Sequence, residues 1–275
     1  NGLGYTVGTP QIGKTQNGKY AAFLASGYAA KDINSPENQT ALYVYDLESS
    51  GTQIAKITVP GGKGGLSSPT LVDTDLNGTV DIAYAGDRGG NMYRFDLSNW
   101  SVRTIFRGTK PITSAPAVSQ LKDKRVVIFG TGSDLTEEDV ANTKDIQSVY
   151  GIFDDKKDSL VFAQEVMENE LLKQELTQVP TKDGKILFLN NKEIGEHKGW
   201  AVDLLPGQRV TIKPTVVLRT AFVTIHNYNA NGCGAETAFL GIDPANGGEL
   251  TKESARPVVP DDRVAKKDTD ELDAK

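Results

Sequence analysis

A short unit of strand-like segments recurs along the chain, and this repeat constrains the fold more than any other feature. Each copy opens with a small residue and a proline, continues into an apolar run ending in glycine, and closes with an aromatic-rich run ending in aspartate. Short runs of this kind, bounded by Gly, Pro, Asn and Asp, are typical of antiparallel meanders. The closing runs are Tyr43–Leu47, Tyr93–Leu97, Val149–Asp154, Trp200–Leu204 and Phe239–Asp243.

These closing runs define about five units, and their spacing points to a specific architecture. Repeats of about 40 to 50 residues with three or four strands are typical of propeller blades. No helical pattern separates the strands regularly, which disfavours alternating strands and helices. We therefore predict an all-β fold, a modified β-propeller of antiparallel meander blades. Residues 1–250 would form the whole propeller domain or most of it.

Three segments depart from the repeat. The charged, Pro-containing stretch 251–275 has no periodicity and is predicted to be a tail or linker. Within 163–179 the first half favours a short helix, whereas the Asp-Gly pair in 182–184 predicts the turn of a hairpin. Thr136, followed three residues later by Asp139, predicts a capped helical turn in a surface loop.

Composition and charge narrow the class of protein. The chain has 275 residues, of which 38% are hydrophobic, so it can bury a sizeable core. A net charge of -6 argues against a nucleic-acid partner, because phosphates need clustered Lys and Arg. No apolar run approaches the roughly 20 residues of a transmembrane helix. The first residues enter patterned sequence without an initiator Met, so we expect a monomeric fragment of a longer precursor.

Oxygen-bearing residues alternate in the second unit, in the stretch "DTDLNGTVD". If Asp73 is position one, Asp75, Asn77 and Asp81 occupy positions three, five and nine, and Thr79 offers a backbone carbonyl at seven. Calcium takes about six to eight oxygen ligands, and alternating donors can wrap around it. The spacing therefore predicts a Ca²⁺ site.

The flanks of this loop predict a β-hairpin. Gly78 at position six permits a sharp turn, but position twelve is Tyr84 and not the Glu of an EF-hand, and both flanks alternate like strands. We therefore expect Asp81 to be a direct ligand. Asp, Asn and Gly are also common turn formers, yet three unneutralised carboxylates so close would repel one another. No Cys or His joins the cluster, which argues against zinc.

The order of several motifs resembles a known family. The segments "LGYTVGTPQIG", "DTDLNGTVDIAYAGDRGGNMYRFDL" and "CGAETAFLGIDPANGGEL" follow one another as in the carboxy-terminal propeller of the PilC/PilY proteins. These proteins are tip-associated adhesins of bacterial type IV pili. The loop itself is also similar to the calcium hairpins of integrin-type propellers.

The resemblance implies a function that the residue pattern alone does not. It implies a secreted protein at the pilus tip and bacterial outer-membrane surface, with pilus components and a host-cell receptor as partners. Bound calcium would regulate pilus biogenesis, retraction, twitching motility and host-cell adhesion, and thus virulence. Its site would consist of Asp73, Asp75, Asn77, Asp81 and the carbonyl of Thr79. The family propeller has more blades than the units visible here.

The alternative hypothesis is an enzyme, a quinoprotein-like propeller dehydrogenase. Such a site needs a general base, a stacking Trp and a metal at the propeller axis. Trp100 and Trp200 are interpreted as core or inter-blade packing, and His197 and His226 as surface or loop residues. Neither histidine has a Ser or Cys in an activating motif. We therefore predict a protein without catalytic or organic-cofactor residues.

Overall fold

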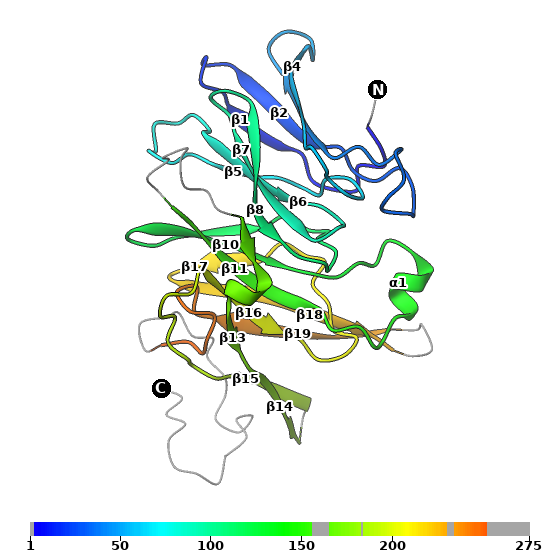
Figure 1. Ribbon diagram of the computed structural model, residues 1–275, viewed down its shortest axis with the longest axis vertical. Helices are drawn as coiled ribbons and strands as arrows, with labels where there is room; N and C mark the ends of the chain where they lie inside the picture. The colour runs from blue at the N-terminus through cyan, green and yellow to red at the C-terminus, as the bar shows by residue number, and fades with distance from the viewer. Residues whose placement is uncertain (1–2, 156–164, 183, 230–233, 252–275) are drawn as a thin grey trace.

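The chain folds into successive antiparallel sheets that follow one another along the long axis of the molecule (Figure 1). The computed structural model describes residues 3–155, 165–182, 184–229 and 234–251. The predicted all-β fold is confirmed in its coarser form, because these residues are mostly β. The assignment of 1–250 to one domain stays a prediction, and all but the first residue of the predicted tail, 251–275, lies outside the described residues.

The first two sheets are meanders in which consecutive strands pair. The first contains β1 (Gln11–Lys14), β2 (Tyr20–Ala25), β3 (Ala41–Asp46) and β4 (Gln53–Thr58). The second contains β5 (Thr70–Val72), β6 (Ile82–Gly86), β7 (Asn91–Asp96), β8 (Ser101–Arg107) and, at its outer edge, the short β12 (Val166–Met167).

The remaining strands form a third and a fourth sheet and a separate hairpin. The third sheet contains β9 (Ala117–Gln120), β10 (Lys124–Gly130), β11 (Ser148–Asp155), β16 (Gly199–Asp203) and β13 (Leu172–Gln174). The fourth contains β17 (Thr215–Val217), β18 (Thr220–Tyr228) and β19 (Ala235–Ile242). The hairpin consists of β14 (Leu176–Thr181) and β15 (Gly184–Leu189).

The middle strands are buried on both faces because the sheets pack face to face. Successive side chains of a strand point to opposite faces. On β6, Ala83 and Ala85 join a hydrophobic cluster shared with the first sheet, whereas Ile82 and Tyr84 join one shared with the third. A further cluster joins the third sheet to the fourth and to the β14–β15 hairpin. This two-sided burial explains the near-continuous apolar runs in the sequence.

The prediction that Trp200–Leu204 closes a separate unit is wrong. These residues include most of β16, which pairs antiparallel with β11 as the next strand of the third sheet. All middle strands are buried on both faces, so their apolar pattern does not show the position of a strand within its sheet. It cannot tell a strand that closes a new unit from one added to the preceding sheet. The described residues therefore form four sheets of three or more strands, in place of the expected five units.

The segment before β16 is strand-rich. The short helix expected in the first half of 163–179 is reduced to a 3₁₀ turn, η1 (Glu168–Glu170). β12 and β13 flank η1 and pair in parallel with β8 and β16, so tertiary pairing overrides local helix propensity. The predicted hairpin is confirmed as β14–β15, although Asp183 of its turn lies outside the described residues.

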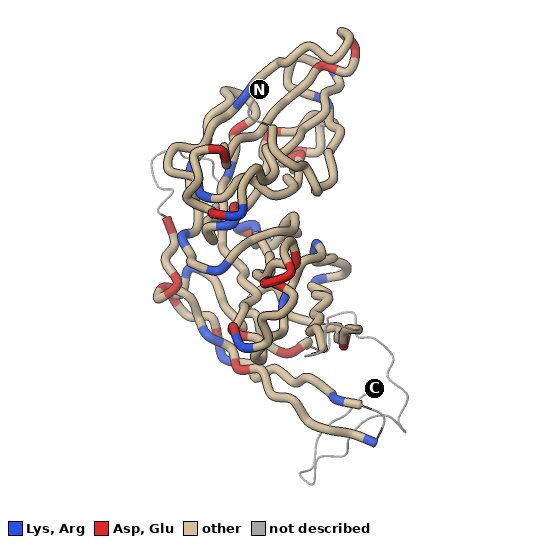
Figure 2. The backbone as a smooth tube through the Cα atoms, turned by 90° about the vertical axis from the view of Figure 1, so that its right-hand side faces the viewer, with Lys and Arg blue, Asp and Glu red and all other residues tan. Residues whose placement is uncertain are grey.

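Charged residues of both signs are distributed over the molecule, and the helices are short. Lys and Arg segments are interspersed with Asp and Glu segments over much of the described tube in Figure 2, and in this view they form no continuous basic stripe. The helix α1 (Glu137–Ala141) lies in the loop between β10 and β11. None of the helices within the described part of the chain has the length and apolarity needed to cross a membrane.

A buried ionic cluster joins the second and third sheets. Asp154 on β11 is 5% exposed and accepts hydrogen bonds from Arg94 Nη1 at 2.9 Å and Arg103 Nη2 at 3.3 Å. The hydroxyl of Tyr84 donates to the same carboxylate, and burial raises the pKa of Tyr84 far above its usual range. The Asp154 carboxylate therefore links three strands of the neighbouring sheet.

We expect Asp154→Ala to destabilise the fold strongly. Removing one member of a buried ion pair costs about 3–5 kcal/mol, because the remaining charge stays buried. Urea denaturation measures this loss. Asp123→Ala, in the exposed β9–β10 turn, is the matched control and should change the free energy of unfolding by less than about 0.5 kcal/mol. Equal stability of the two variants would contradict a role for Asp154 in joining the sheets.

Candidate metal site at a hairpin tip

The stretch 73–81 connects two paired strands of the second sheet. β5 and β6 pair antiparallel, with Val72 opposite Ile82, and the amide of Asp81 donates to the carbonyl of Val72 at 2.9 Å. The predicted β-hairpin is therefore confirmed. Its loop is longer than a tight two-residue turn, and the extra residues bring several acidic side chains to one tip.

Three of the predicted ligand residues converge at this tip. One carboxylate oxygen from each of Asp73, Asp75 and Asp81 lies within 4.8 Å of the others. Asp75 is exposed, whereas Asp73 and Asp81 are half-buried. This group could hold a metal ion, and its oxygen-only donors suit a hard cation better than zinc.

The two other predicted ligand residues, Asn77 and Thr79, lie in the same loop, where they hydrogen-bond to each other. The Asn77 side-chain Nδ2 donates to Asp75 Oδ2 at 2.9 Å, and the Asn77 amide donates to Asp73 Oδ1 at 3.2 Å. Asn77 Oδ1 accepts bonds from the amide of Thr79 at 2.8 Å and from its hydroxyl at 2.6 Å. In this arrangement Asn77 donates to the carboxylates, and its oxygen faces Thr79.

The backbone of the loop adopts left-handed conformations at two positions. Gly78 has φ +89°, as its place in the motif predicts, and its amide donates to Asp73 Oδ2 at 2.8 Å. Leu76 has φ +59° and a side chain that is 87% exposed, which the sequence did not predict. Since non-glycine residues seldom adopt positive φ, tight folding around the carboxylates carries a local conformational cost.

Sequence reasoning missed two residues that hold Asp81. The amide and the hydroxyl of Thr74 both donate to Asp81 Oδ2 at 2.7 Å. Gln16, from the β1–β2 turn of the first sheet, places Nε2 2.6 Å from Asp81 Oδ1. The alternation of oxygen donors gives no signal for Thr74, and Gln16 is 65 residues away in sequence.

Comparison with known proteins decides the family. A family model described as the PilY1 beta-propeller domain matches residues 1–192. The chain belongs to this PilY1 family. Type IV pilus biogenesis factor PilY1 of Pseudomonas aeruginosa strain PAO1 is 28% identical over 308 residues, covering 90% of this chain and 26% of that protein. A PilY1 homolog of Xylella fastidiosa is 27% identical, covering 90% of this chain and 19% of that protein.

A solved structure of the family supports the same architecture. The crystal structure of the Pseudomonas aeruginosa PilY1 C-terminal domain matches with a TM-score of 0.77 and 24% sequence identity. The match covers 90% of this chain and 61% of the solved one. The antiparallel sheets of this PilY1-family chain are therefore propeller blades, and the chain spans only part of its relatives.

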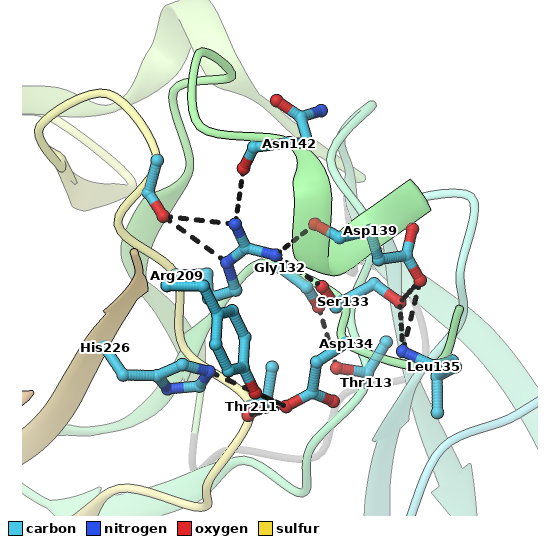
Figure 3. Close-up of polar contacts among 12 residues, drawn as sticks. Thr113, Gly132, Ser133, Asp134, Leu135, Asp139, Asn142, Arg209, Thr211 and His226 are labelled. Atoms are coloured by element: carbon cyan, nitrogen blue, oxygen red, sulfur yellow. Dashed lines mark hydrogen bonds and ion pairs between the residues drawn. The ribbon is translucent and has the colours of Figure 1, made fainter. Parts of the chain in front are cut away.

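A second polar cluster of the PilY1-family chain surrounds one of the two histidines (Figure 3). His226, expected at the surface or in a loop, lies on β18 with a side chain only 11% exposed, so that expectation is wrong. Its Nε2 lies 3.6 Å from Asp134 Oδ2, which also accepts bonds from Thr211 at 3.1 Å and Tyr228 at 3.2 Å. The neighbouring imidazole of His226 is the main cause that lowers the pKa of Asp134.

This second cluster has the geometry of a structural anchor. The hydroxyls of Thr211 and Tyr228 point to the Asp134 carboxylate, so neither is placed as a nucleophile against the imidazole of His226. His197, the other histidine, is exposed in the loop before β16, as expected.

Arg209 fixes the neighbouring α1 loop. It is 4% exposed, and its guanidinium donates to the backbone carbonyls of Ser133 at 3.1 Å and, as Figure 3 shows, of Asp139 and Asn142. The predicted helical cap is confirmed, because Thr136 Oγ1 accepts a bond from the Asp139 amide at 3.2 Å. The backbone of Arg209 also pairs with His226 of β18 in an isolated bridge, so the residue ties the loop to the fourth sheet.

We expect Arg209→Met to loosen this loop. The change removes the donor to three loop carbonyls and should cost at least about 3 kcal/mol, since one hydrogen bond to a charged group contributes about 1.5–3 kcal/mol and the three bonds of one guanidinium are not additive. Hydrogen exchange should speed up selectively in residues 133–142. Lys182→Met, at the exposed end of the β14–β15 hairpin, is the control. Unchanged exchange in 133–142 would show that the loop keeps its conformation without the hydrogen bonds of Arg209.

Proposed function

We propose that this chain is a noncatalytic, calcium-binding propeller domain of a type IV pilus-associated adhesin. The observation that carries the proposal is the convergence of the Asp73, Asp75 and Asp81 carboxylates to within 4.8 Å, on a chain of the PilY1 family. Calcium is a hard cation that prefers oxygen ligands and tolerates irregular geometry. Extracellular calcium is also available to a protein on a bacterial pilus.

The loop residues would share the work of holding the ion. Asp73, Asp75 and Asp81 supply the negative charge, and the Asn77 side chain and the Thr79 carbonyl supply neutral oxygens. For this, the side-chain carboxamide of Asn77 rotates so that its oxygen no longer faces Thr79. Bound calcium contributes charge neutralisation at the hairpin tip. Thr74 and Gln16 hold the Asp81 carboxylate in place through hydrogen bonds.

The biological role follows from the family and from the nature of the site. The relatives are named type IV pilus biogenesis factors, which supports an extracellular location at the pilus tip and outer-membrane surface. In the proposed role, calcium occupancy regulates pilus biogenesis and retraction, and with them twitching motility and host-cell adhesion. The partners are pilus components and a host-cell receptor.

The dehydrogenase alternative has less support. A quinoprotein site needs an accessible indole to stack on the cofactor. Trp200 is fully buried, and its Nε1 donates to the Pro244 carbonyl at 2.8 Å. A Cβ atom added at Gly151 would lie 2.1 Å from the indole, so the ring is closely covered. Trp200 therefore packs the core, as the sequence interpretation held.

We expect Asp81→Ala to abolish tight calcium binding and to leave the fold largely intact. The loop belongs to one hairpin, whereas the hydrophobic clusters lie between sheets. Isothermal titration calorimetry should give a wild-type dissociation constant on the order of micromolar to millimolar, the range of sensor and extracellular sites. Circular dichroism checks the fold.

The control for this titration is Asp123→Ala, which removes an exposed carboxylate outside the loop. It should bind calcium like the wild type. A wild-type chain that binds no calcium would refute the proposal, and global unfolding of Asp81→Ala at ordinary temperature would show that the loop is a structural element of the blade.

In bacteria that carry the full-length protein, we expect Asp81→Lys and Asp81→Ala to have opposite effects. The Lys ammonium lies where charge neutralisation is needed and should mimic the calcium-loaded loop, whereas Ala should mimic the empty one. Surface piliation and twitching motility, measured at saturating and depleted calcium, report the difference. Wild-type behaviour of both variants in all conditions would remove the regulatory role.

A further inference from the structure

The candidate metal loop touches a second blade through one side chain. Gln16 lies in the turn between β1 and β2 of the first sheet, whereas the loop belongs to the second. Its Nε2 lies 2.6 Å from Asp81 Oδ1, 3.3 Å from Thr79 Oγ1 and 3.4 Å from the Val80 carbonyl oxygen. All three partners lie at the end of the loop that leads into β6.

The chemistry of these partners fixes the role of the Gln16 carboxamide. The Asp81 carboxylate and the Val80 carbonyl can only accept hydrogen bonds, so the NH₂ group of Gln16 faces the loop. The other oxygen of Asp81 accepts two bonds from Thr74. Both oxygens of this carboxylate are therefore held, one from within the loop and one from the neighbouring blade.

The turn that carries Gln16 is itself braced against the loop. The amide of Val80 donates to the Lys14 carbonyl at 2.8 Å, which adds a backbone bond between the two blades. A Cβ atom added at Gly13 would lie 2.8 Å from Val80 Cγ1 and 3.0 Å from Leu71 Cδ1. The close approach therefore depends on glycine at position 13.

We propose that Gln16 is a positioning residue of the cation site and couples the first blade to cation binding. Its carboxamide orients Asp81 without being a ligand, as outer hydrogen-bond partners commonly do for metal-binding side chains. The proposal rests on the proposed calcium-binding function of the loop. Coupling is reciprocal: if the docked turn strengthens cation binding, the bound cation strengthens docking of the turn by the same factor.

The test compares three variants of the chain with the wild type, with calcium as the probe. Gln16→Ala removes the amide, and Gly13→Ala keeps the amide but pushes the turn away from Val80 and Leu71. Gln53→Ala removes an exposed amide from β4, at the opposite edge of the same sheet, and serves as the matched control. Calorimetry gives calcium affinity, and hydrogen exchange of residues 15–19 is measured with and without calcium.

We expect calcium affinity to fall about tenfold in Gln16→Ala, at the lower end of the effect of losing an outer partner, and to stay unchanged in Gln53→Ala. Gly13→Ala should also bind more weakly. In the wild type, calcium should slow exchange in residues 15–19, and this protection should disappear in Gln16→Ala. A merely structural role for Gln16 would lower the stability of the calcium-free chain without changing these two calcium-dependent readouts.

The outcomes separate this inference from the proposed function. If the wild type binds calcium and Gln16→Ala binds it equally well, or if calcium protects residues 15–19 equally in both, the coupling is refuted and the calcium site stands. If the wild type binds no calcium, the proposed function and the coupling fall together.

Discussion

Burial of both faces of the middle strands determines the rest of this structure. Each middle sheet presents one set of side chains to the preceding sheet and the alternate set to the following one, so it is packed from both sides. Such packing fixes the positions of the strand ends, and with them the turns that project from the sheets. The β1–β2 turn and the β5–β6 loop consequently meet, which brings Gln16 onto Asp81.

Asp154 and the carboxylates of the 73–81 loop lie in different surroundings, and this difference determines what each acidic group can do. Asp154 is buried between sheets and is neutralised by Arg94 and Arg103, so its charge serves the interface. The carboxylates of the loop receive neutral donors, including the Gly78 amide and the Gln16 carboxamide. Hydrogen bonds from neutral groups relieve only part of the repulsion among clustered carboxylates. The loop therefore remains an acidic group that could hold an external cation.

The sequence predicted the features that are encoded locally. The hairpin loop and the Thr136 cap depend on residues less than ten positions apart, and both were found as expected. The partner of β16 depends on pairing across a long insertion, and the apolar pattern of a doubly buried strand gives no information on its neighbour. His226 was misplaced for a related reason, because the burial of one polar residue depends on Asp134, which is distant in sequence.

The contact between Gln16 and Asp81, 65 residues apart in sequence, suggests how the noncatalytic 73–81 loop could influence a large assembly. A cation at an isolated hairpin tip would order only the loop, and its effect would decay within that blade. Under the proposed coupling, the contact from Gln16 to Asp81 and the Lys14 to Val80 backbone bond would carry the same event into the neighbouring blade. Because inter-blade contacts set the relative positions of the surfaces at this end of the strands, cation binding would act on a composite surface of two blades. Under the proposed function, that composite surface is the one through which calcium occupancy reaches the pilus.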